Sequence, residues 1–408
     1  MLGVSVKKIQ ENGGNTLVFL TFICRSFLRK PPSIFSQEAS TMIHTFAIIR
    51  PITNSQLQFI MESARVPQAT RTAFTNTTEG TIIHNIIIRR WLNDRNPETG
   101  IHYLKLIRIG DRNRCNYYAI IVIEPLVTIL GYRTVDLFQA NSGNIHRLVE
   151  RFHEIMSSHF DDHDMYDLVS WSCHRIDYTF NFRFDNDNGK NLFLYLSRKT
   201  SRYVRKHRNI LPNLKKAEQS TAESNKSVKV MFYDKRKQIL ETYYPDNHRI
   251  HLANSAYAVV RFEVQCKHGR IRTIKDRYGF ENRSILNYLN EDIAVHVLLT
   301  EYEYSIGSGD FYTLYHAQKR INESHYTETL KRRLYQCLQL ISQARHIDVA
   351  QKQFVLGTRI KRTDIIVKGS RDTFIKRLKQ LKAIGINPMP IPKEFRITYF
   401  YNPKYQMM

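Results

Sequence analysis

One tyrosine and two acidic residues stand out because they occupy three segments with the same alternating pattern. They are Tyr233 in residues 228–235, Asp177 in residues 176–184, and Glu263 in residues 259–267. In each segment apolar residues alternate with polar ones, as in a strand with one buried face, and all three residues fall on polar positions. A phenol can attack a phosphodiester and become linked to the new 5′ phosphate, leaving a free 3′ hydroxyl. The three residues therefore favour a protein that cuts and rejoins a DNA strand.

The same chemistry needs positive charge close to the phosphate. Carboxylates such as Asp177 and Glu263 can hold a divalent cation, and their hard oxygen atoms favour Mg²⁺ or Mn²⁺ over zinc. We expect Lys235, on the same face of its strand as Tyr233, to hold a phosphate oxygen or to help the phenol lose its proton. Each residue also has an ordinary interpretation, since a lone strand tyrosine is usually a packing residue and Glu263 could pair with Arg261. Only the combination favours a site.

The charge of the chain points to a polyanionic partner. It has 61 Lys and Arg residues against 37 Asp and Glu residues, which gives a formal net charge of +24. Nucleic acid is the expected partner, because phosphate contacts release counterions and dominate affinity. Each basic stretch alone could still be a solvated helix face, although Tyr203 in residues 198–208 could stack on a melted strand. The residues expected to contact DNA are Arg198, Lys199, Arg202, Arg205, Lys206, Arg261, Lys376 and Lys379.

Several other classes of protein are disfavoured by what the sequence lacks. The five cysteines lie far apart without a Cys-x-x-Cys pair, which predicts a reducing cytoplasm and no structural zinc. The apolar residues 16–24 are too few for a bilayer span of about 20 residues, so no membrane association is expected. A phosphate loop of the type G-x-x-x-x-G-K is also missing, which argues against a helicase of that class.

The elements expected around these residues predict an α+β fold. Besides the three segments above, short β-branched runs predict further strands, and Ser142 opens a segment with apolar residues at helical spacing. If the strands pair in one antiparallel sheet, helices cover its apolar face, and Asp177, Tyr233 and Glu263 meet on the open face. The expected parts are a disordered or spurious extension over residues 1–41, a catalytic nicking domain over residues 42–305, and a mainly helical DNA-binding region over residues 306–408.

At these residues the chain resembles the replication initiators of filamentous bacteriophages, the gene II protein family, and the related initiators of rolling-circle plasmids. The resemblance extends from Met42 to about Tyr405 and depends on short segments in a shared order. The segments are MIHTFAIIRP at residues 42–51, IEP at 123–125 followed by LG at 130–131, HRIDYTF at 174–180, FYDK at 232–235, VRFE at 260–263, and SRDTFIK at 370–376 followed by GI at 385–386.

The resemblance implies a rolling-circle replication initiator with a relaxase-like sheet. Such a protein nicks double-stranded DNA at an origin and later rejoins the displaced single strand, working in a bacterial cytoplasm with the host helicase and polymerase. Matched segment by segment, Tyr233 would be the DNA-linked tyrosine with Lys235 beside it. Asp177, Glu263 and Glu124 would hold the Mg²⁺ or Mn²⁺ ion.

Three alternatives stay open at this point. Tyr233 and Glu263 are only 30 residues apart (263 − 233), which is less than we expect for the phage proteins, so Tyr243, Tyr244 or Tyr203 could be the nucleophile instead. A plasmid or transposon relaxase would use the same site at a different origin. A non-catalytic DNA-binding protein, which marks an origin or coats a single strand, would need only the basic surface.

Overall fold

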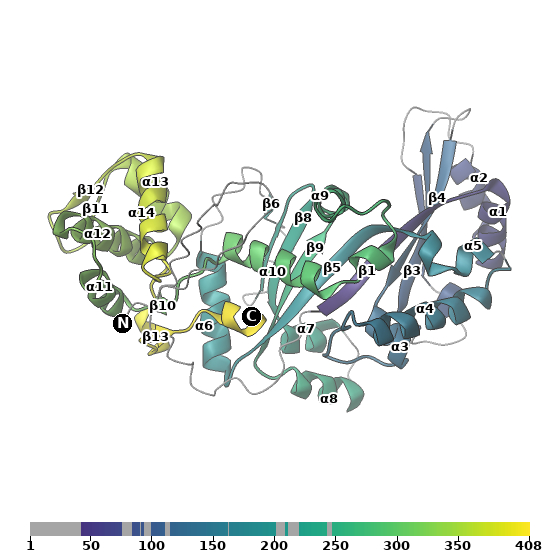
Figure 1. Cartoon of the computed structure of the whole chain (residues 1–408), viewed down its shortest axis with the longest axis horizontal. Coiled ribbons are helices and arrows are strands. Elements are labelled where there is room, and N and C mark those ends of the chain that lie inside the picture. Colours follow the sequence, from purple (N-terminus) through teal and green to yellow (C-terminus); the bar gives the residue numbers. More distant parts are fainter. Residues whose placement is uncertain are drawn as a thin grey trace, which may run out of the picture. The chain divides into compact units, whose positions relative to one another are not determined.

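The structure is a computed structural model. It describes residues 42–75, 84–89, 91–93, 99–110, 115–161, 163–200, 209–210, 220–242 and 247–408. By their contacts Ala39–Met408 form one unit, and the predicted N-terminal extension over residues 1–41 lies outside the described residues. The fold is that of the described residues of this unit (Figure 1).

One antiparallel sheet forms the centre of this unit. Its strands run in the order β2-β3-β4-β1-β5-β9-β8-β7-β6, and every neighbouring pair is antiparallel (Figure 1). This confirms the predicted α+β class with a large antiparallel sheet. The strands are β1 (Met42–Ile52), β2 (His84–Ile88), β3 (Ile101–Gly110), β4 (Cys115–Ile123), β5 (Ser172–Arg183), β6 (Asn209–Ile210), β7 (Ser220–Ser224), β8 (Val228–Asp234) and β9 (Val259–Cys266).

Along the chain, the described helices lie between and after these strands. They are α1 (Asn54–Ser63), α2 (Gln68–Thr75), α3 (Pro125–Leu130), α4 (Ser142–Ser157), α5 (His163–Tyr166), α6 (Asp187–Lys199), α7 (Lys235–Thr242), α8 (Asn247–Ser255), α9 (His268–Tyr278), α10 (Glu291–Ser305), α11 (Leu314–Asn322), α12 (Glu328–Ala344), α13 (Ile347–Leu356) and α14 (Arg371–Ala383). The predicted helix from Ser142 is thus confirmed as α4, whose N-cap Asn141 accepts a hydrogen bond from the backbone of Asn144.

The glutamate strand, rather than the tyrosine strand, lies in the middle of the three candidate strands. β9 pairs with β5 on one side and with β8 on the other, so that Glu263 lies opposite Thr179 and Met231. The tyrosine strand β8 is next to β7 on its outer side. One boundary also differs from the prediction, because β8 ends at Asp234 and Lys235 begins α7.

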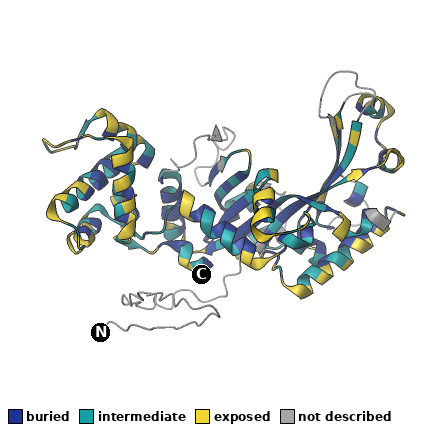
Figure 2. Ribbon diagram, turned by 45° about the horizontal axis from the view of Figure 1, so that its top comes forward, coloured by how far each residue is buried: buried dark blue, intermediate teal, exposed yellow. Residues whose placement is uncertain are grey.

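The apolar face of the sheet carries the core. Alternate residues of β5, β8 and β9 are fully buried against α6, α9 and α10, and the rings of Phe232 and Phe262 stack with centroids 4.5 Å apart. Burying such a ring stabilises the fold by about 1.5–3 kcal/mol. The central strands are buried along most of their length, whereas exposed residues gather on the helices (Figure 2). This core fixes which face of each strand remains for the polar residues.

Helices lie next to the polar face as well, which differs from the predicted open face. Val135 packs with Ile239 of α7, with Ala253 of α8 and with Ala256 just after α8 in a small apolar cluster. The carbonyl oxygen of Val135 accepts a hydrogen bond from Arg261 on the polar face of β9. A buried guanidinium needs such acceptors, and the segment around Val135 with α7 and α8 supplies one while shielding it from water.

The chain after Ile306 is mainly helical, as predicted. α11 to α14 contact one another, and a short hairpin of β11 (Thr358–Arg359) and β12 (Ile366–Val367) lies between α13 and α14. Ser370 accepts a hydrogen bond from the backbone of Thr373 and so caps α14. A third small sheet joins β10 (Phe311–Tyr312) to β13 (Tyr399–Phe400). The division at residue 305 into two domains stays a prediction.

Two further expectations can be compared with the described residues. Within that part of the chain, no helix combines the length and the apolar composition that crossing a membrane requires. The four cysteines that lie in it, Cys115, Cys173, Cys266 and Cys337, are free thiols.

Candidate functional site

A β-bulge in β1 brings His44 to the polar face of the sheet. The sequence analysis did not single out this histidine. Ile43 pairs with Tyr178 and Thr45 pairs with Asp177, so His44 is an extra residue between two consecutive pairs. Bulges bend a strand and re-aim its side chains, and they are frequent beside functional sites. The signal in the sequence was the adjacent polar pair of His44 and Thr45 inside an otherwise apolar run.

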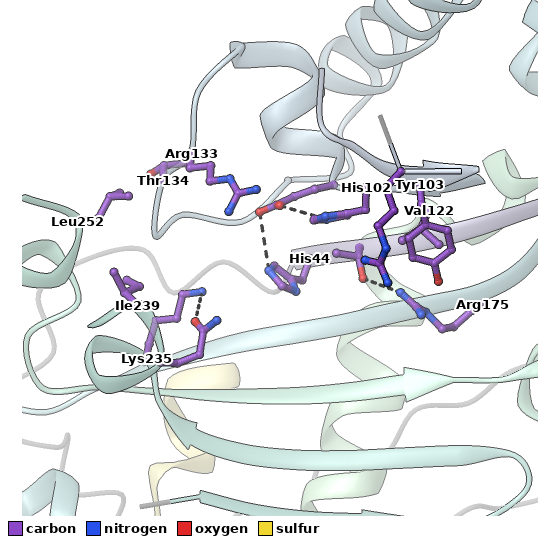
Figure 3. A pocket seen from close by; sticks show the side chains of 14 residues that line it. His44, His102, Tyr103, Val122, Arg133, Thr134, Arg175, Lys235, Ile239 and Leu252 are labelled. Atoms are coloured by element: carbon purple, nitrogen blue, oxygen red, sulfur yellow. Dashed lines mark hydrogen bonds and ion pairs between the residues drawn. The ribbon is translucent and has the colours of Figure 1, made fainter. Parts of the chain in front are cut away.

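The bulge places His44 in a series of side-chain contacts that begins at Tyr233, the predicted nucleophile. The hydroxyl of Tyr233 donates to Oε2 of Glu263 at 3.1 Å, and Nδ1 of His44 lies 3.6 Å from the same oxygen. Nε2 of His44 lies 3.8 Å from Oε1 of Glu124, whose Oε2 is 3.4 Å from Nε2 of His102 (Figure 3). The contacts therefore connect the phenol to both predicted glutamates.

A basic pocket opens at the Glu124 end of this series of contacts (Figure 3). Its volume is about 400 Å³, and Glu124 is the one acidic residue among those that line it. The positive charge of its walls suits an anion such as a phosphodiester. Tyr233 and Glu263 do not line the pocket but reach it through His44. The lining residues are His44, Thr45, Arg89, His102, Tyr103, Val122, Glu124, Arg133, Thr134, Arg175, Lys235, Gln238, Ile239 and Leu252.

The pKa values of Tyr233 and of its partner Glu263 are both raised. Burial, together with the nearby charge of Asp177, raises the pKa of Glu263 to about 7. Burial, followed by the charge of Glu263, raises the pKa of Tyr233 well above its usual value. The phenol therefore keeps its proton in the resting protein, while Glu263 can gain or lose one near neutral pH.

Glu124 and His44 are shifted in the opposite direction. Burial alone would raise the pKa of Glu124, but the hydrogen bond of His102 and nearby positive charge, including that of Arg133, outweigh it, and the pKa falls to about 2. Burial, assisted by the charge of Arg261, lowers the pKa of His44 well below its usual value. Glu124 thus stays ionised at physiological pH, and the imidazole of His44 is neutral there.

Asp177 reaches the same polar face but is held by other partners. The hydroxyl of Thr45 donates to its Oδ2, and Nη2 of Arg175 lies 3.2 Å from the same oxygen. Burial raises the pKa of Asp177, against the opposing charge of Arg175. The side chain is only 2% exposed and does not line the pocket. Asp177 thus acts on Glu263 through its charge, as the pKa shift of Glu263 indicates.

The described residues supply suitable donor atoms for a cation, but no preformed cage. Among them, no group of three or more His, Cys, Asp or Glu side chains has a metal-binding arrangement. The ionised carboxylate of Glu124 and that of Glu263 are the oxygen donors that Mg²⁺ and Mn²⁺ prefer, and the neutral imidazole of His44 between them fits Mn²⁺ better than Mg²⁺. Binding would require these side chains to exchange their mutual contacts for the ion.

Lys235 lines the pocket from the first turn of α7. Its Nζ donates to Oε1 of Gln238 at 2.9 Å, and the residue is 8% exposed. Burial, followed by the charge of Arg261, lowers the pKa of Lys235 well below its usual value. A lysine of this kind can give up a proton more readily than a surface lysine.

The predicted DNA contacts fall into three groups. Arg261 is 1% exposed, and its guanidinium donates to Oδ1 of Asn181 and to the carbonyl of Val135 at 2.9 and 2.6 Å, so the predicted DNA contact is wrong in this conformation. Arg198 and Lys199 are half-buried at the end of α6, and Lys376 and Lys379 are exposed on α14. Outside the described residues lie Arg202, Arg205 and Lys206, and with them the alternative tyrosines Tyr203, Tyr243 and Tyr244.

The fold and the site together define an α+β protein that holds a phenol–carboxylate pair beside a basic pocket. No family model, no curated protein and no solved structure matches this chain. The likeness to the gene II protein family therefore depends on the short segments of this sequence alone.

Proposed function

We propose that this protein nicks and rejoins one strand of DNA through Tyr233 and so initiates rolling-circle replication. The observation that carries the proposal is the 3.1 Å hydrogen bond from the Tyr233 hydroxyl to Glu263, which His44 connects to a pocket walled by Arg89, Arg133 and Lys235. A nucleophile next to its base, with an anion-binding space one side chain away, is an arrangement that suits phosphoryl transfer. The net charge of +24 supports a nucleic-acid substrate.

Four side chains of the protein carry out the proposed reaction. The scissile phosphate binds between Arg133 and Lys235, and Glu263 accepts the phenolic proton as the Tyr233 oxygen attacks the phosphorus. The bond from phosphorus to the 3′ oxygen breaks, and Lys235 gives the departing oxygen a proton to form the 3′ hydroxyl. The product is a 5′-phosphotyrosine ester, and the reverse sequence rejoins the strand. A pKa of about 7 suits Glu263 to both directions near neutral pH.

A divalent cation fits this scheme beside the carboxylates. Glu124 and Glu263 would hold Mg²⁺ or Mn²⁺, and His44 between them would turn one of its nitrogens to the ion. When bound, the ion supplies positive charge to the phosphoryl oxygens and lowers the cost of ionising the phenol.

The test is the formation of a covalent protein–DNA adduct that survives denaturant. We expect the wild-type protein to form it on supercoiled origin DNA with Mg²⁺ or Mn²⁺, and Tyr233→Phe to bind the DNA without forming it. Tyr315→Phe is the matched control, because it removes the same phenolic hydroxyl from a residue of α11 that is 72% exposed. An adduct in Tyr233→Phe at the wild-type level would disprove the role of Tyr233, and sequencing the linked peptide would then identify the true nucleophile.

A passive DNA-binding protein is the second candidate. The raised pKa of Tyr233 favours it, because a phenol that keeps its proton is a poor nucleophile until substrate or cation arrives. DNA binding without any nick or adduct in either cation would establish this alternative. A plasmid or transposon relaxase would pass the adduct test, and only its origin sequence would differ.

A further inference from the structure

The hairpin between α13 and α14 exposes apolar side chains among basic ones. Ile366 on β12 is 69% exposed, and Leu356 at the end of α13 is 78% exposed, with Ile365 beside them at 40%. The exposed cations Lys361 and Arg362 lie at the turn of the same hairpin. These five residues, Leu356, Lys361, Arg362, Ile365 and Ile366, are called the hairpin surface below.

Several contacts hold the hairpin in one conformation. The side chain of Gln343 on α12 donates to the carbonyl of Arg359 at 3.3 Å and accepts from the backbone N–H of Lys361 at 2.9 Å. Ile360 and Val367 are buried under it, so the two strands are anchored from below. The apolar side chains on the outside are therefore held in water instead of being free to fold inward. Such a cluster usually marks a contact surface.

The charge of the hairpin surface selects the kind of partner. Arg359 pairs with Asp364 across the hairpin, which leaves Lys361 and Arg362 as the excess charge at the turn. The basic character continues along the chain through Lys368 into α14, where Lys376 and Lys379 are exposed. A surface that is apolar at its centre and cationic at its edges complements a polyanion with apolar grooves, and duplex DNA has both properties.

We propose that the hairpin surface binds duplex DNA by inserting into the minor groove, at a site separate from the nicking pocket. The minor groove is only about 6 Å wide, but some β-ribbon proteins place strands in it. Lys361 and Arg362 bind the flanking phosphates, and Ile366 contacts the sugar walls and the base edges as an apolar wedge. This inference rests on the proposed function in that DNA is the partner, but it assigns a separate role: holding the duplex while another part of the molecule cuts it.

The test measures duplex binding of the full chain by fluorescence anisotropy over a range of salt concentrations. Lys361→Ala and Arg362→Asn together should weaken binding about tenfold and reduce the slope of log K against log salt by about two. Asn is chosen for position 362 because Arg362 has φ 61°, a conformation that Asn tolerates. Ile366→Thr should weaken binding with an unchanged salt slope, since it removes no charge. A minor-groove ligand such as netropsin should compete with the wild-type protein.

Arg147→Ala is the control, because Arg147 is an exposed cation on α4 outside this region. Wild-type affinity in the hairpin variants, an equal loss in Arg147→Ala, or no competition by netropsin would each overturn the inference. So would a dimer in light scattering that Ile366→Thr disrupts without changing DNA binding, since the surface would then serve a second copy. These readouts do not involve Tyr233, and adduct formation on a short single-stranded oligonucleotide should be equal in all variants.

Discussion

His44 and Glu263 come from strands that are not adjacent in the sheet, yet Nδ1 of His44 lies 3.6 Å from Oε2 of Glu263. That oxygen also accepts the hydrogen bond of Tyr233. One carboxylate oxygen thus lies between a phenol and an imidazole, and the bulge in β1 makes this contact possible. The position of the base in the proposed reaction therefore depends on a residue far from it in sequence.

Replacing His44 should slow the proposed nicking reaction without weakening DNA binding. His44→Ala removes the imidazole that contacts both Glu263 and Glu124, and losing such a supporting partner typically costs about 10- to 100-fold in activity. The measurement is the single-turnover rate of adduct formation, with DNA affinity determined in parallel. His325→Ala, at an exposed histidine of the C-terminal region, should leave both unchanged. An unaltered rate in His44→Ala would remove His44 from the site.

Glu263→Gln should stabilise the protein at alkaline pH while abolishing activity. The pKa of Glu263 is raised by burial from 4.5 to about 7 in the folded protein, so the folded state favours the protonated form. The wild type therefore loses stability as pH rises from about 4.5 to about 7, by up to about 3 kcal/mol. The neutral amide of Gln avoids this loss. Denaturant unfolding should show the variant to be more stable than wild type at pH 8.

At pH 4.5 the two proteins should differ much less, because wild-type Glu263 is then protonated in the folded state. A stability difference that is the same at pH 4.5 and pH 8 would contradict the assigned shift. The comparison separates the effect of ionisation from any change in packing, since packing does not depend on pH.

Arg261→Met should destabilise the fold instead of selectively weakening DNA binding. The variant removes the guanidinium that donates to Asn181 and to the carbonyl of Val135, and it leaves both acceptors buried without that donor. We expect a loss of about 2–4 kcal/mol in unfolding free energy. The salt dependence of DNA binding should keep its wild-type slope, because Arg261 makes no phosphate contact. A slope reduced by about one would instead restore Arg261 as a DNA contact.

Much of the local structure could be predicted from the sequence alone. The period of two in residues 176–184, 228–235 and 259–267 identified three strands and the face to which Asp177 and Glu263 belong. Ser142 and the apolar residues at helical spacing after it identified α4. These features depend on residues close to one another in the chain, where steric and hydrogen-bond preferences act directly.

The sequence therefore predicted the type of these elements and the face on which their polar residues lie. The three-dimensional packing was needed to show that β9 lies between β5 and β8, that His44 joins the site, and that Arg261 is buried. Strand alternation fixes a face but not a neighbour, since any strand with an apolar face can pair with any other. Thr45 and Asp177 meet across 132 residues, and the packing of the whole core selects such a contact, which no local pattern encodes.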